Sequence, residues 1–86
     1  MSEDVRLKRL RIRSWRRGTK EMDLILGGFC DAELGRLAEA DTALYEDLLS
    51  ENDHDLYHWV TGQVAPPPRL AALVARIAAH ARGSAA

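Results

Sequence analysis

The chain has 86 residues, with 12 lysines and arginines, 13 aspartates and glutamates, and one cysteine, which is the size of one small domain. A domain of this size buries only about 60–65% of its unfolded surface, so a deep enzymatic cleft is not expected. The single cysteine, Cys30, excludes an internal disulfide and forms no recognisable zinc pattern with the scattered histidines. No apolar run approaches the roughly 18 residues of a membrane span, and no signal peptide is recognisable, so we expect no membrane insertion and a cytoplasmic location.

The net charge of −1 conceals three blocks of opposite sign. Residues 1–20 carry eight basic and two acidic side chains, residues 21–55 carry one basic and eleven acidic, and residues 56–86 carry three basic and none acidic. Such blocks indicate a protein that presents basic and acidic surfaces to different partners, or one that folds them against each other.

A basic helix over residues 5–17, followed by a tight corner, opens the chain. A helical wheel places five arginines within an arc of about 100°: Arg6, Arg9, Arg13, Arg16 and Arg17. Gly18 can adopt the positive φ that ends a helix, and Thr19 offers a hydroxyl to cap the next one. Glu21 lies in the first turn of that helix but completes no capping box, so it is free to face a partner.

Helical periodicity continues directly after the corner. Four apolar residues at positions i, i+3, i+4 and i+7 predict a second helix with one buried face: Met22, Ile25, Leu26 and Phe29. Gly27 and Gly28 weaken the end of this helix, and Asp31 is expected to cap a short turn after it.

Three more helices are predicted in the rest of the chain. Residues 39–50 form one with an acidic outer face, and Asp53 is expected to be the N-cap of a short helix that Gly62 ends. Prolines 66–68 precede the last helix, because proline is tolerated only at the start of a helix. That helix has a clear apolar stripe: Leu70, Leu73, Val74, Ile77, Ala78 and Ala81.

These elements predict an all-α fold, a compact bundle of about five short helices. The whole chain, 1–86, forms one domain with a frayed tail at 83–86, and no segment alternates with the period of a strand. Cys30 is expected to be a small buried hydrophobe, while Trp15 is undecided between core and interface. The predicted core includes Met22, Ile25, Phe29, Leu48, Trp59, Leu73 and Ile77.

The corner and four later stretches resemble a known family. Arg17-Gly18-Thr19-Lys20-Glu21 matches the Arg-Gly-x-x-Glu signature of the SdhE/Sdh5 flavinylation and assembly factors of succinate dehydrogenase. The resemblance continues, in the same order, through residues 22–23, residues 45–49, residues 53–59 and the proline linker. Mitochondrial members carry a transit peptide that is absent here, so the chain resembles a bacterial, cytoplasmic member.

The resemblance implies a five-helix protein without enzymatic activity. Such a factor binds the flavoprotein subunit of succinate dehydrogenase, or of a related fumarate reductase, and promotes covalent attachment of FAD to it. The family's client-binding surface is carried over to Arg17, Gly18 and Glu21, and with them to Arg9, Arg13 and Asp23. As exposed charges, Arg17 and Glu21 are expected to contribute no more than about 1 kcal/mol to stability.

No residue is expected to be catalytic, to bind a metal, or to hold FAD tightly. The chain lacks a glycine-rich phosphate motif and the strands of a dinucleotide-binding fold. An alternative function is nucleic-acid binding or regulation through the basic face of the first helix, where five arginines could contact phosphates. A pI of about 6.3 and the acidic stretch that follows favour a protein partner and no nucleic acid.

Overall fold

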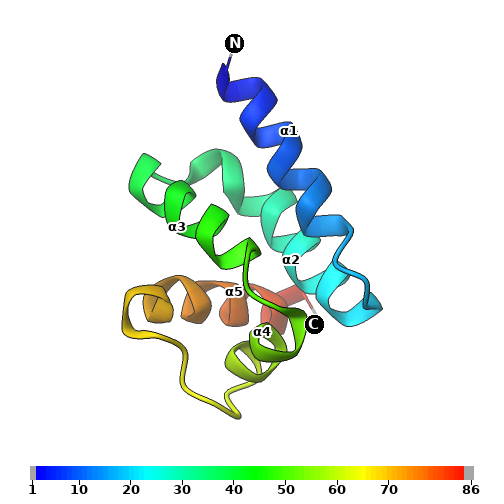
Figure 1. Cartoon of the computed structure of the whole chain (residues 1–86), viewed down its shortest axis with the longest axis vertical. Helices are drawn as coiled ribbons and strands as arrows, with labels where there is room; N and C mark the ends of the chain where they lie inside the picture. Colours follow the sequence, from blue (N-terminus) through cyan, green and yellow to red (C-terminus); the bar gives the residue numbers. More distant parts are fainter. Residues whose placement is uncertain (1, 85–86) are drawn as a thin grey trace.

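The computed structural model describes residues 2–84, and every regular element among them is helical, as predicted. Helices α1 and α2 form an antiparallel hairpin, and α3, α4 and α5 pack beside it (Figure 1). The helices are α1 (Ser2–Trp15), α2 (Lys20–Glu33), α3 (Glu39–Leu49), α4 (Asp53–Val60) and α5 (Ala71–Ser84), with 3₁₀ turns η1 (Leu34–Arg36) and η2 (Pro68–Leu70).

All five helices contribute side chains to one apolar core. Five of the seven predicted core residues are buried: Met22, Phe29, Leu48, Leu73 and Ile77. Ile25 and Trp59 are only partly buried and pack against the core from outside. The prediction for Trp59 was wrong in degree, because the eight-residue α4 buries Leu56 and Val60 and leaves Trp59 on the flank of that stripe.

A polar contact joins three helices inside this core. The Oγ atom of Ser14 lies 2.7 Å from the Tyr45 hydroxyl, which donates to the backbone carbonyl of Leu26 over 3.2 Å. The Ser14 Oγ atom also lies 2.7 Å from the Leu10 carbonyl of its own helix, so the two hydroxyl protons are shared among three contacts. Burial raises the pKa of the Tyr45 hydroxyl and of the Cys30 thiol, because each would carry its charge in an apolar environment.

Helix α2 runs through Gly27 and Gly28, so the prediction that Asp31 caps a separate turn was wrong. A Cβ atom at Gly27 would overlap the indole ring of Trp15, so the glycine here permits close packing of α1 on α2. Trp15 is 37% exposed, and its Nε1 donates to a carboxylate oxygen of Asp31 over 3.2 Å. The side chain that sequence left undecided therefore lies at the edge of the α1–α2 contact.

Three other boundaries differ from the prediction. Helix α1 ends at Trp15, before Arg17. Asn52, and not Asp53, caps α4, since its Oδ1 accepts the Asp55 N–H at 2.8 Å. Helix α5 includes residues 83–84, which were expected to fray, and 85–86 lie outside the described residues. Gly62, with φ of +81°, follows α4 as predicted.

The basic and acidic blocks fold against each other. Arg6 of α1 donates to both carboxylate oxygens of Glu39 at 2.8 Å and to Glu46 of α3 at 2.8 Å. The Arg6 guanidinium lowers the pKa of Glu39 by these hydrogen bonds. Further cross-element pairs are Arg11–Asp31, Arg69–Asp47 and Arg76 with Glu33 and Asp41. Part of the arginine stripe is therefore used inside the fold.

Candidate functional site

The corner between α1 and α2 has the predicted positive φ and the predicted helix cap, although α1 ends three residues before Gly18. Gly18 has φ of +104°, a conformation that residues with a side chain rarely adopt. Thr19 is the N-cap of α2 and its hydroxyl accepts the Met22 N–H at 3.3 Å. Glu21 lies in the first turn of α2. Local chemistry alone explains these three positions.

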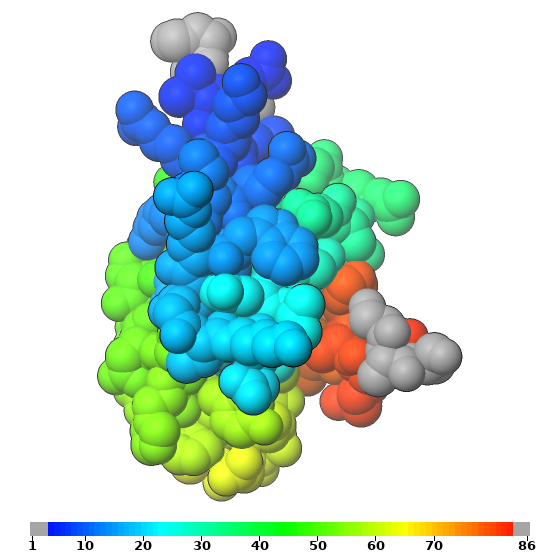
Figure 2. Space-filling model, turned by 90° about the vertical axis from the view of Figure 1, so that its right-hand side faces the viewer, coloured from blue at the N-terminus to red at the C-terminus, as the bar shows by residue number. Residues whose placement is uncertain are grey.

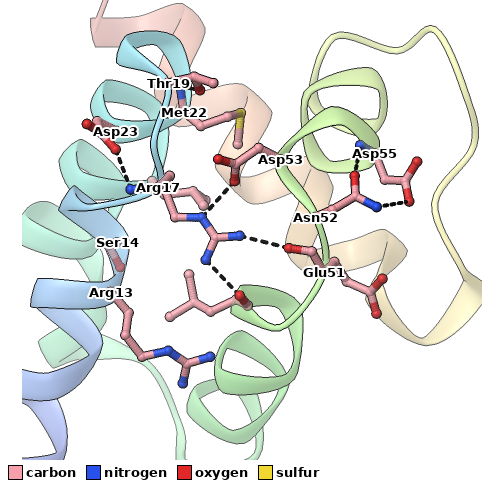
Figure 3. Close-up of polar contacts among 12 residues, drawn as sticks. Arg13, Ser14, Arg17, Thr19, Met22, Asp23, Glu51, Asn52, Asp53 and Asp55 are labelled. Atoms are coloured by element: carbon pink, nitrogen blue, oxygen red, sulfur yellow. Dashed lines mark hydrogen bonds and ion pairs between the residues drawn. The ribbon is translucent and has the colours of Figure 1, made fainter.

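Arg17 connects the corner to the α3–α4 connection beside it (Figure 3). Its Nε donates to Asp53 Oδ1 at 2.8 Å, its Nη1 to the Leu49 carbonyl at 2.7 Å, and its Nη2 to the Glu51 carbonyl at 2.8 Å. Only 11% of the Arg17 side chain is exposed. We call these contacts the Arg17 clamp. The clamp holds the α1–α2 corner against the α3–α4 connection.

The acceptors of the clamp explain why arginine is suited to this position. Leu49 is the last residue of α3, and Glu51 lies two residues after it. Their carbonyls therefore belong to a helix end, where carbonyl groups lack donors from the same helix. A cation is also favoured there by the helix dipole. The planar guanidinium reaches two carbonyls and the Asp53 carboxylate at once, which a lysine cannot do. The expectation that Arg17 is an exposed charge was wrong.

Asp23 closes the corner from inside. Its Oδ1 accepts the backbone N–H of Arg17 at 2.6 Å, and the side chain is partly buried. Gly18 and Glu21, in contrast, are exposed. A Cβ at Gly18 would meet no atom within 4 Å, and the Glu21 carboxylate has no hydrogen bond or ion pair within residues 2–84. Arg17 and Asp23 thus support the corner, while Gly18 and Glu21 form its outer surface.

The other two predicted site residues lie on the exposed side of α1. Arg9 has no polar partner among the described residues, and Arg13 reaches Ser50 Oγ at 3.5 Å. Figure 2 shows the side chains of α1 and of the corner as one continuous surface. Because Arg6 and Arg17 are bound to acids of the same chain, the stripe available to phosphates is smaller than the sequence suggested.

Two hollows adjoin the corner, and sequence analysis did not predict them. One, of about 360 Å³, is bordered by Glu21, His54 and Tyr57. The other, of about 560 Å³, lies between α2, α4 and α5 and is also bordered by Glu21 and Tyr57. Leu24 is 56% exposed and Tyr57 is 38% exposed beside them. Leu24 is an apolar residue outside the predicted apolar stripe of α2, and this was the feature of the sequence that could have indicated an exposed apolar surface here.

Within residues 2–84, no three histidine, cysteine or acidic side chains are grouped to hold a metal ion. In the same range, no helix is both long enough and apolar enough to span a membrane. Cys30 is buried with a raised pKa, so its thiol stays in the weakly nucleophilic protonated form.

Comparison with known proteins gives one consistent result. The FAD assembly factor SdhE of Legionella pneumophila (strain Lens) is 39% identical over 62 residues, which cover 72% of this chain and 78% of that protein. The mitochondrial succinate dehydrogenase assembly factor 2 of Drosophila grimshawi is 39% identical over 67 residues, 76% of this chain and 46% of that protein. That of Komagataella phaffii is 39% identical over 69 residues, 78% of this chain and 36% of that protein.

The chain thus spans less than half the length of these mitochondrial relatives. The family Sdh5, described as "Flavinator of succinate dehydrogenase", matches residues 8–81. This range contains the corner, the Arg17 clamp and the residues that line both hollows, except for Arg82 at the border of the larger hollow. On this match, and on the relatives named above, the chain belongs to the Sdh5 family.

Proposed function

We propose that this chain is an assembly factor that binds the flavoprotein subunit of succinate dehydrogenase and promotes covalent attachment of FAD to it. The family match over residues 8–81 carries this proposal. A fumarate reductase flavoprotein is a second proposed client. The similarity to a bacterial assembly factor supports a site of action in the bacterial cytoplasm.

The proposed role is binding and orientation without catalysis by this chain. FAD supplies the chemistry of the new bond, and a factor that orders the client's flavin site brings the reacting groups into line. The hydroxyl of Tyr45 and the thiol of Cys30 are buried, which supports a non-catalytic role. The isolated chain is not expected to bind FAD tightly.

Within this role, the outer surface of the corner meets the client. Gly18 lets the client backbone approach closely, and Glu21 offers an acceptor. Arg9 and Arg13 extend the contact along α1, and their exposure supports that assignment. Arg17 serves the same surface from behind, because the clamp fixes where Gly18 and Glu21 lie relative to α4.

The test is complementation of cells that lack their own factor, with covalent flavin on the client measured by in-gel fluorescence after denaturation. Glu21→Ala should lower covalent flavin, whereas Asp4→Ala, which removes an exposed acid from the other end of the hairpin, should not. Normal covalent flavin with a well-folded Glu21→Ala would contradict the role of the corner. Micromolar or tighter binding of FAD by the purified chain in calorimetry would favour flavin delivery instead.

A further inference from the structure

The larger hollow has an apolar wall built by three helices. Its lining includes Leu24 and Ile25 of α2, Val60 of α4, and Ala78 and Ala81 of α5. Earlier in α5, the same face carries the larger residues Leu73, Val74 and Ile77, so the change to alanine leaves space beside α2 and α4. Small side chains opposite Leu24 and Tyr57 thus produce an open apolar hollow of about 560 Å³.

Two charged side chains that have no partner within the described part of the chain border this apolar wall. Glu21 and Arg82 both line the hollow, and neither has an ion pair or hydrogen bond with another described residue. The nearby Asp53 is different, since Arg17 neutralises it. On the α2 side, the hollow is therefore complementary to an apolar group that has a basic group next to it.

The position of the hollow links it to the corner. Glu21 borders the hollow and also belongs to the corner surface. A stable protein complex commonly buries about 800 Å² on each partner, which Gly18 and Glu21, even with Arg9 and Arg13, cannot supply. An exposed tyrosine at a hollow is typical of the energetic centre of an interface, and an exposed leucine beside it adds apolar area.

We infer that this hollow, here called the α2–α4–α5 groove, receives a segment of the flavoprotein client. The segment places an apolar side chain against Ile25, Val60 and Ala78, and a lysine or arginine beside it pairs with Glu21. The inference rests on the proposed function and names the part of the client that this surface recognises. It also places Leu24 and Tyr57 at the interface.

The test measures binding of the purified flavoprotein subunit, without covalent flavin, to the full chain by calorimetry. Leu24→Glu and Val64→Glu form a matched pair, because the two side chains are 56% and 51% exposed and only Leu24 lines the groove. Leu24→Glu should weaken binding about tenfold or more, and Val64→Glu should stay within about twofold of the parent chain. Both variants should keep the parent melting temperature. Equal affinities of the two variants would overturn the inference.

A second measurement tests the basic group of the segment. Glu21→Gln keeps the shape of the side chain and removes its charge, so it should weaken binding at low salt by about fivefold and reduce the salt dependence of the affinity. An unchanged salt dependence would overturn the pairing with a basic residue. Sedimentation that shows a dimer lost in Leu24→Glu, with client binding intact, would assign the groove to a second copy and overturn the inference. Failure of the parent chain to bind the client would instead refute the proposed function itself.

Discussion

Replacing Arg17 by alanine should destabilise the fold, although Arg17 belongs to a motif that looks like a surface signature. The substitution removes three hydrogen bonds of 2.7–2.8 Å from a side chain that is 11% exposed. It leaves the Asp53 carboxylate, which is 17% exposed, without its cation, and it leaves the Leu49 and Glu51 carbonyls without these donors.

The expected cost is about 3 kcal/mol. Removing one partner of a buried ion pair costs about 3–5 kcal/mol, and the lower end applies because water reaches part of Asp53. Individual hydrogen bonds to a charged group are worth about 1.5–3 kcal/mol, but three bonds from one group are not additive. For a domain of this size the melting temperature should fall by roughly 12–24 °C. Arg17→Lys should recover only part of the loss, since one ammonium cannot reach all three acceptors.

Urea denaturation followed by far-UV circular dichroism at pH 7 measures this cost. Arg16→Ala is the matched control, because the neighbouring arginine is exposed and has no partner among residues 2–84. The control should change the free energy of unfolding by no more than about 0.5 kcal/mol. A difference between the two variants below about 1 kcal/mol would refute the assignment of Arg17 to the fold.

Three further predictions concern the corner and the core. Gly18→Ala should cost about 1–2 kcal/mol in urea denaturation, because its φ of +104° strains any side chain even though the space is open, and an unchanged midpoint would count against this. Gly27→Ala should displace the Trp15 indole, shift its fluorescence and cost about 1–3 kcal/mol, whereas an unchanged emission spectrum would argue against the close contact. Burial raises the pKa of Tyr45 in the folded chain, so the unfolded chain loses the Tyr45 proton at lower pH than the folded chain does. The stability that the neutral hydroxyl contributes is complete below the unfolded tyrosine pKa of about 10 and is lost as the pH rises through the folded value. The free energy of unfolding should therefore fall from about pH 9 to about pH 11, less steeply in Tyr45→Phe, and equal slopes would contradict this.

The parts of the fold and site that local chemistry determines could be predicted from the sequence. Helical periodicity and the properties of Gly18 and Thr19 depend on near neighbours along the chain. The acceptors of the Arg17 clamp lie 32 to 36 residues further on, so no local pattern indicates them. The five-residue signature therefore looked like one exposed unit, whereas the structure separates it into supporting and outward-facing residues.

The cap of α4 shows the same limit. Asn52 and Asp53 are adjacent, and both types of side chain are good N-caps. What distinguishes them is the clamp, because Asp53 pairs with Arg17 while Asn52 caps the helix. A choice between two locally equivalent residues was made by a contact from the α1–α2 corner.

The contact of Ser14 with Tyr45 has a consequence for how the helices are aligned. The hydrophobic effect is non-directional, so apolar contacts fix the axial position of α1 less sharply than a hydrogen bond does. A hydroxyl pair 2.7 Å apart is satisfied at one position only. Because Ser14 and Tyr45 come from α1 and α3, a slip of α1 would separate the two hydroxyls and remove this hydrogen bond from the core. Together with the contact of Trp15 on Gly27, the two hydroxyls thereby help to set the register of α1 against α2 and α3, and with it the height at which the α1–α2 corner is presented.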